Sequence, residues 1–215
     1  MKFQYNKFIN NSICIFGENN LVKIIIKKFF QAGLKKLTLY STQTYLENFS
    51  LDYLKDTNFE KFNLLTYESN PFFLESAMVN NSLVIDTFEN MNHKLEVADA
   101  CMKVAKPGIF VFKQNYNYQL YPMLAGKSRC LHCLSEAGIL LEQAIIKKDN
   151  EINILIEDIM ASLIVFEIVK LSSNFGITQG NEIFQFNFLS GEINTIQGLD
   201  KLDDCPDCGF KSVPR

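Results

Sequence analysis

Ser12-Ile-Cys-Ile-Phe16-Gly17-Glu-Asn-Asn20 is a short apolar run with β-branched isoleucines that ends in a polar turn. Such a run predicts a buried strand. Leu21–Ala32 follows with apolar residues at helical spacing, and Gly33 marks the end of that helix. Leu37-Thr-Leu-Tyr40 then predicts a second strand. The order of strand, turn, helix, glycine and strand is typical of the opening of a Rossmann-like α/β unit.

Alternation of strands and helices continues downstream. We expect strands at Asn63–Tyr67, Ser82–Asp86 and Gly108–Phe112, and helices at Pro71–Val79 and Asn90–Ala105. The apolar face of the second helix is expected to consist of Leu95, Ala98, Met102 and Ala105. Because the strands are continuously apolar, they are expected to be buried on both faces. The fold class is therefore α/β, with a mostly parallel, Rossmann-like sheet flanked by helices.

The pattern changes after residue 112. Residues 115–121 are irregular and aromatic, and helices are expected at Leu134–Lys148 and Ile156–Ser172. Glu182–Phe188 alternates like an antiparallel strand, and Ile193–Gln197 can pair back with it as a hairpin. The second helix carries two apolar stripes, so a partner or a second subunit is expected to cover one of them, and we expect a homodimer. The stripes are Ile159, Leu163, Phe166 and Val169, and Ile164, Val165 and Ile168.

Composition limits the possible functions. The chain has 215 residues of which 47% are hydrophobic, enough for one sizeable core. A net charge of −3 gives no electrostatic case for binding nucleic acid. The longest apolar run, Ile159–Val169, is shorter than the ~18 residues of a membrane span. The first residues, Met1–Asn6, contain no apolar segment typical of a signal peptide, so we expect a cytoplasmic protein without membrane contact.

Two C-x-x-C pairs carry the clearest chemical signal. They are Cys130 with Cys133 and Cys205 with Cys208. This spacing lets both thiolates of a pair bind one ion, with Zn–S distances near ~2.3 Å, and Pro206 and Gly209 favour the tight turn that the second pair needs. Four thiolates complete a tetrahedral shell, which predicts a structural zinc ion. Zinc would tie the C-terminus back to the middle of the chain, which predicts a zinc-stapled C-terminal half, residues 116–215, packed on a Rossmann-like half, residues 1–115, in a single domain.

Three alternatives for these cysteines remain open, namely disulfides, a redox site and an incidental arrangement. Disulfides require an oxidising compartment, and a redox C-x-x-C normally lies in a thioredoxin-like setting. Two pairs in one small domain favour a metal over both. His132 lies between the first two cysteines, and we expect it beside the cluster because four cysteines already complete the shell. Cys14 and Cys101 have apolar neighbours and are expected to be buried.

The order of these motifs resembles a known family. Val84–Asn90 at the end of a strand, Lys106-Pro107 after a helix and the two C-x-x-C pairs look like the ThiF/MoeB-type, ubiquitin-activating-enzyme-like adenylyltransferases. Tyr121-Pro122 with Gly126–Cys133, and Asp204–Gly209 after the hairpin, resemble the bacteriocin ThiF-like branch of thiazole/oxazole-modified peptide biosynthesis. The resemblance implies a partner and scaffold for a YcaO-type cyclodehydratase that engages the leader of a precursor peptide.

The chain departs from this family where nucleotide binds. The family's glycine-rich loop is reduced to Gly17, and Glu18 would repel phosphate. Tyr40 stands where the family places an aspartate for the ribose, and Tyr45–Ser50 lacks the family's phosphate-neutralising arginine. At the strand end Glu89 replaces the family's second aspartate, whereas Asp86 and Asn90 are kept. Gly17, Asp86, Glu89 and Asn90 are thus vestigial nucleotide-site positions.

These residues predict the roles that remain. We expect no ATP binding and no catalytic residue, and we expect Asp86 to cap the next helix or anchor a loop. Related peptide-modifying members carry an N-terminal winged-helix recognition element, and none fits before Ser12, so the leader is expected to contact the Rossmann-like body or a partner. Tyr116, Tyr118 and Tyr121 form either a peptide-binding surface or a cover over the core.

The functional hypothesis is a non-catalytic, zinc-containing scaffold. It binds a ribosomal precursor peptide and presents it to a YcaO-type cyclodehydratase, and to an azoline dehydrogenase, in a thiopeptide-like pathway. The alternative is a divergent ATP-dependent adenylyltransferase that acts on the carboxyl terminus of a peptide or carrier protein. A third possibility is a subunit stabiliser without peptide contact.

Overall fold

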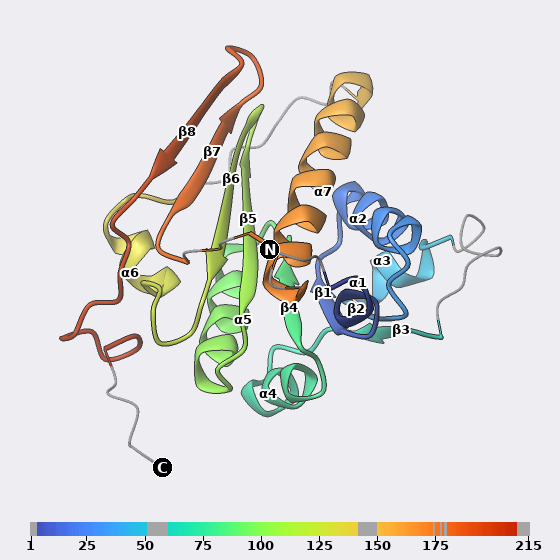
Figure 1. Ribbon diagram of the computed structural model, residues 1–215, viewed down its shortest axis with the longest axis horizontal. Coiled ribbons are helices and arrows are strands. Elements are labelled where there is room, and N and C mark those ends of the chain that lie inside the picture. The colour runs from blue at the N-terminus through green and yellow to red at the C-terminus, as the bar shows by residue number, and fades with distance from the viewer. Residues whose placement is uncertain are drawn as a thin grey trace.

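The computed structural model describes residues 4–50, 60–141, 150–173, 175–176, 178 and 180–209. An eight-stranded sheet with the order β3-β2-β1-β4-β5-β6-β7-β8 runs through its centre (Figure 1). The strands are β1 Ser12–Phe16, β2 Lys36–Ser41, β3 Lys61–Thr66, β4 Leu83–Asp86, β5 Gly108–Gln114, β6 Asn117–Met123, β7 Ile183–Asn187 and β8 Glu192–Ile196. Strands β1 to β5 pair in parallel, and β5 to β8 pair antiparallel. The predicted α/β class is confirmed.

Helices cover both faces of this sheet. They are α1 Tyr5–Ile9, α2 Asn20–Gln31, α3 Gln43–Glu47, α4 Pro71–Val79, α5 Met91–Lys103, α6 Leu131–Glu136 and α7 Asn150–Ser173. Alternate residues of β1 enter two separate cores. Ile13 and Ile15 pack with α2 and α7, whereas Cys14 and Phe16 pack with α4, α5 and α6. The strands are therefore buried on both faces, as their continuous apolar runs predicted.

Strand β6 was not predicted. Residues 115–121 were expected to be irregular, but Asn115 and Tyr116 form only the turn of a β5–β6 hairpin, with Asn115 at φ 55°. Tyr118 and Leu120 enter the core on the α7 side, while Gln119 is fully buried on the other side. The Gln119 amide donates to Ile139 O and accepts from Leu141 N. A buried, fully bonded glutamine obscured the apolar alternation.

Three helical predictions need correction. The helix expected over residues 134–148 ends with α6 at Glu136, and Gly138 turns the chain at φ +64°; residues 142–149 lie outside the described part. The buried face of α5 includes Lys94, Val97, Ala98 and Cys101, so of the expected residues only Ala98 is fully buried within the helix. Leu95 and Met102 are partly buried. The helix ends before Ala105, which has φ 54°. Helix α7 begins at Asn150, before the expected start.

Helix α7 buries one of its two apolar stripes fully and the other in part. Ile164, Val165 and Ile168 lie in the core with Ile156 and Met160. On the other stripe, Leu163 and Val169 are partly buried against this core, whereas Ile159 is 49% exposed and Phe166 is 50% exposed.

Candidate functional site

The two C-x-x-C pairs meet at one point. Their four Sγ atoms lie within 4.8 Å of one another, with Cys130 to Cys205 at 3.8 Å and Cys133 to Cys205 at 3.3 Å. A tetrahedral zinc site with Zn–S bonds of ~2.3 Å has S···S edges of about 3.8 Å. The four cysteines can therefore hold a metal ion. Among the described residues this is the group of side chains placed to do so.

Local structure positions each pair. Cys130 is the N-cap of α6, so Cys133 lies in the first helical turn. In the second pair, Gly209 N donates to Cys205 O at 2.8 Å and closes a tight turn. A Cβ on Gly209 would lie 2.5 Å from Cys205 O and 2.6 Å from Leu202 O, so only glycine fits.

The thiols of the cluster differ in acidity. Burial raises the pKa of Cys133 to about 12 and raises that of Cys130 further. Burial also opposes ionisation of Cys205, but hydrogen bonds from the backbone N–H groups of Cys208 and Asp207 and from the thiols of Cys133 and Cys208 together lower the Cys205 pKa to about 7. The turn thus prepares one thiolate, and a cation among the sulfurs would favour the others.

His132 does not join the four sulfurs. Its Nε2 lies 3.1 Å from Asp99 Oδ2 on α5, and this carboxylate raises the pKa of His132 against the opposing effect of burial. The contact links α6 to α5 at the rim of the cluster.

The loop between β1 and α2, where the family binds phosphate, is bonded to the protein itself. Glu18 accepts from Thr42 Oγ1 at 2.8 Å, and Asn19 O accepts from Tyr45 OH at 2.9 Å. Asn19 also caps α2 and donates to Thr87 O at 2.8 Å. The side chains of Glu18 and Asn19 and the carbonyl of Asn19 are therefore engaged within the protein.

Gly17 is required by packing. A Cβ at this position would overlap Thr87 Oγ1 and lie 2.8 Å from Val22 Cγ2. The retained glycine therefore lets the loop approach Thr87 closely, which accounts for it without a phosphate.

Two carboxylates lie at the start of α2. Glu18 precedes the helix, and Glu157 of α7 accepts from Asn20 Nδ2 at 2.8 Å. Glu157 is 7% exposed and also accepts from Lys113 Nζ at 3.0 Å. Helix N-termini attract anions, and at the start of α2 the anions are carboxylates of the protein itself. A phosphate at this place would meet the charge of Glu18 and a second carboxylate, Glu157, that is already paired with Lys113.

Asp86, at the end of β4, forms a buried ion pair with Lys94 of α5. Its Oδ1 accepts from Lys94 Nζ at 2.7 Å, and both side chains are buried. Burial raises the pKa of Asp86 and lowers that of Lys94, while the ion pair opposes both shifts. The Lys94 ammonium also lies 4.9 Å from the centroid of the Phe112 ring. Asp86 therefore anchors α5 to the sheet.

The other vestigial positions are also accounted for. Asn90 caps α5 by accepting from Asn92 N at 2.9 Å and His93 N at 3.4 Å, and Glu89 is exposed. Tyr40 is buried and stacks on Phe16, with ring centroids 4.9 Å apart. An aromatic pair thus occupies the carboxyl end of β2, where the resemblance places a ribose ligand.

Two of the three tyrosines proposed for peptide contact belong to the core. Tyr118 is 1% exposed and Tyr121 is 0% exposed, and Tyr121 OH donates to Arg129 O at 2.6 Å. Only Tyr116, in the β5–β6 turn, is partly exposed. Tyr118 and Tyr121 therefore do not form the surface that was considered for them.

The sequence reasoning missed Lys94 and Glu157. Both interrupt an otherwise apolar helix face, Lys94 beside Ala98 and Cys101, and Glu157 beside Ile156 and Met160. A single charge in a buried stripe indicates a buried partner, and this signal was present in the sequence.

The fold and the cysteine cluster define a Rossmann-like α/β protein in which four cysteines from the middle and the C-terminal part of the chain meet and could hold a metal ion. A model of the ThiF family matches residues 52–207, and the chain belongs to this family. No curated protein matches it. Within the described residues, none of the helices is both long and apolar enough to span a membrane.

Solved structures share the fold. Escherichia coli MccB superposes with a TM-score of 0.71 at 12% identity, covering 98% of this chain and 68% of that protein. The microcin C7 biosynthetic enzyme MccB in complex with N-formylated MccA gives 0.72 at 13%, covering 95% and 69%. PaaA gives 0.65 at 14%, covering 92% and 67%. At these identities the likeness concerns the fold alone.

Proposed function

We propose that this chain is a non-catalytic ThiF-like scaffold that binds a ribosomal precursor peptide and presents it to a YcaO-type cyclodehydratase, with an azoline dehydrogenase as a further partner in a thiopeptide-like pathway. One observation carries the non-catalytic part. Glu18 and Glu157 occupy the helix start where phosphate would bind, and Lys94 neutralises Asp86. Family membership and a fold shared with MccB, solved with MccA, support the link to peptides.

A divergent adenylyltransferase is the second candidate. The fold is shared with MccB in a structure solved with ATP, at a TM-score of 0.72 and 13% identity. This function would require the β1–α2 loop to release its bonds to Thr42 and Tyr45 before nucleotide enters.

We further propose that the metal is zinc and that its role is structural, because four thiolates leave no open coordination position. It would join the two ends of the second half, residues 116–215, which packs on the Rossmann-like half, residues 1–115, within one domain. Such thiolates persist in a reducing compartment, so we place the protein in the cytoplasm. A second copy covering Ile159 and Phe166 of α7 would make the protein a homodimer.

Two measurements on the purified chain test the function. Exchange of labelled pyrophosphate into ATP is expected to stay at the buffer background, and exchange above it would establish the adenylyltransferase. Fluorescence anisotropy with a labelled Cys- and Ser-rich precursor peptide is expected to show saturable micromolar binding. Lack of binding up to millimolar chain would overturn the scaffold and leave a subunit stabiliser.

A further inference from the structure

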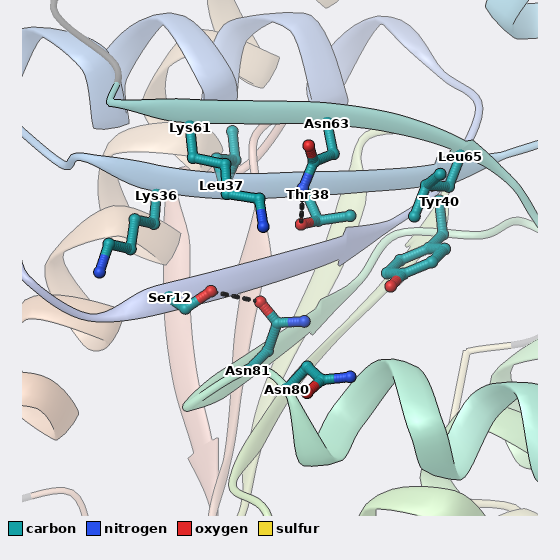
Figure 2. Close-up of a pocket in the computed structure, with 10 residues that line it drawn as sticks. All are labelled: Ser12, Lys36, Leu37, Thr38, Tyr40, Lys61, Asn63, Leu65, Asn80 and Asn81. Atoms are coloured by element: carbon teal, nitrogen blue, oxygen red, sulfur yellow. Dashed lines mark hydrogen bonds between the residues drawn. The ribbon is translucent and has the colours of Figure 1, made fainter.

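A cavity of about 440 Å³ lies against β2 and β3, beside the turn that follows α4 (Figure 2). Its lining includes Ser12, Lys36 and Lys61, which are the first residues of β1, β2 and β3. The vestigial nucleotide loop follows the last residue of β1, so the cavity reaches the opposite end of these strands. Its volume falls within the range of small-ligand sites.

Pairing of the strands places like charges side by side. Lys36 lies opposite Lys61, and Thr38 lies opposite Asn63. Like charges directly opposite in a sheet destabilise it, and an anion between them removes the repulsion. Neither lysine forms an ion pair within the described residues; Glu60 is bound by Lys35 at 2.7 Å, although it is close enough to Lys36 to feel its charge. The described lining contains no acidic residue, although the whole chain has a net charge of −3.

The asparagines of the lining offer a second kind of contact, because the amide oxygens of the exposed Asn80 and the partly buried Asn63 can accept hydrogen bonds. Asn63 donates to Thr38 Oγ1 at 3.4 Å and Asn80 donates to Ser76 O at 3.0 Å, so each amide nitrogen is engaged. Among the described residues no donor reaches the Oδ1 of either side chain. Asn81, by contrast, is 4% exposed and bonded to both Ser12 Oγ and Ala77 O, which makes it a fixed wall.

A matching ligand carries carboxylates for the lysines and N–H donors for the amide oxygens. An acidic peptide offers both, through its side chains and its backbone, whereas inorganic phosphate satisfies the lysines only. Strand β3 is also an edge of the sheet, so an extended segment can run beside it. In Figure 2 the lysines, Asn63 and Thr38 lie on the strands, across from Asn80 and Asn81.

We propose that this cavity binds an acidic segment of the precursor peptide, with an Asp or Glu carboxylate held between Lys36 and Lys61. This inference rests on the proposed function and names the part of the peptide that the chain recognises. The contacts are charge-assisted and partly exposed, so the affinity falls as salt rises.

Two labelled octapeptides test the site on the full chain by fluorescence anisotropy. One alternates aspartate with serine, and the other carries asparagine in place of aspartate. The acidic peptide is expected to bind, and Lys36→Gln with Lys61→Gln is expected to weaken it about tenfold, a difference that anisotropy resolves. The matched control, Lys7→Gln with Lys27→Gln, removes two exposed lysines of α1 and α2 and leaves the affinity unchanged.

Four results would overturn the site. They are equal affinity for the two octapeptides, an equal loss in both lysine variants, no binding of the acidic peptide at millimolar chain, and displacement by inorganic phosphate at the peptide's own concentration. The precursor peptide separates the two proposals. If it binds the wild-type chain and the cavity variant equally, the acidic-segment proposal fails and the scaffold stands. If only the acidic octapeptide binds, the scaffold fails and the cavity remains a peptide site.

Discussion

The cysteine clasp and the β1–α2 loop differ in what their polar groups face. In the clasp, four sulfurs point at one another within 4.8 Å. In the loop, Glu18, Asn19 and Asn20 are bonded to Thr42, Thr87 and Glu157. Sulfur atoms that converge on one point can bind a metal ion together. Polar side chains that are already hydrogen-bonded within the protein are not free to bind a ligand. The chain thus keeps four thiols that converge on one point, and it bonds the polar side chains of the β1–α2 loop to its own residues.

The largest effect should follow from removing the clasp. Cys205→Ser with Cys208→Ser is expected to abolish metal binding and to unfold the C-terminal segment, because structural zinc contributes on the order of 10 kcal/mol to small zinc modules. Elemental analysis should give one zinc per wild-type chain and almost none in the variant, with a clear fall in Tm. His132→Ala is the control, since His132 bonds to Asp99, and should keep its zinc. Full zinc content in the double variant would refute the clasp.

The sequence predicted the parallel half of the fold well because continuous apolar strands and helical spacing are local signals. It also predicted the cysteine cluster, because two C-x-x-C pairs have few other uses in a small domain. It missed β6, where the buried Gln119 interrupts the pattern. It also missed the Lys36–Lys61 pairing, because strand register is a tertiary property that no local spacing reveals.

The next effect should come from the buried ion pair. Lys94→Met leaves Asp86 without its counter-ion and is expected to cost about 3–5 kcal/mol. Asp86→Asn with Lys94→Met is the control and should recover most of this, because no buried charge remains. Urea unfolding of both variants measures the difference, and equal stabilities would contradict the role of the pair.

The loss of stability caused by Lys94→Met should also depend on pH. The folded-state pKa of Asp86 is raised above its unfolded value by burial, so the folded variant retains the proton more strongly. Stability is therefore greatest at acidic pH and is lost as the pH rises from the unfolded towards the folded pKa. The loss in the single variant should shrink on acidification, and a pH-independent loss would exclude Asp86 as its source.

A smaller effect is expected at Gly17. Gly17→Ala places a Cβ against Thr87 Oγ1 and Val22, and such overpacking costs about 1–3 kcal/mol. Adding Thr87→Ala removes the hydroxyl and should restore part of the stability. Thermal unfolding of the two variants tests this. If Thr87→Ala brings no recovery, the glycine is needed for something other than its approach to Thr87.

The smallest effect should come from Glu18. Glu18→Gln keeps an acceptor for Thr42 and removes the charge at the start of α2, so stability should change by less than about 1 kcal/mol. Glu157 and the bonds of Asn19 stay in place, so ATP binding measured by calorimetry should remain undetectable. If Glu18→Gln alone gave micromolar ATP affinity, the loop would be a nucleotide site that only the charge of Glu18 blocks. The difference between the cysteine cluster, which can bind a ligand, and the β1–α2 loop, which cannot, would then depend on the Glu18 side chain alone.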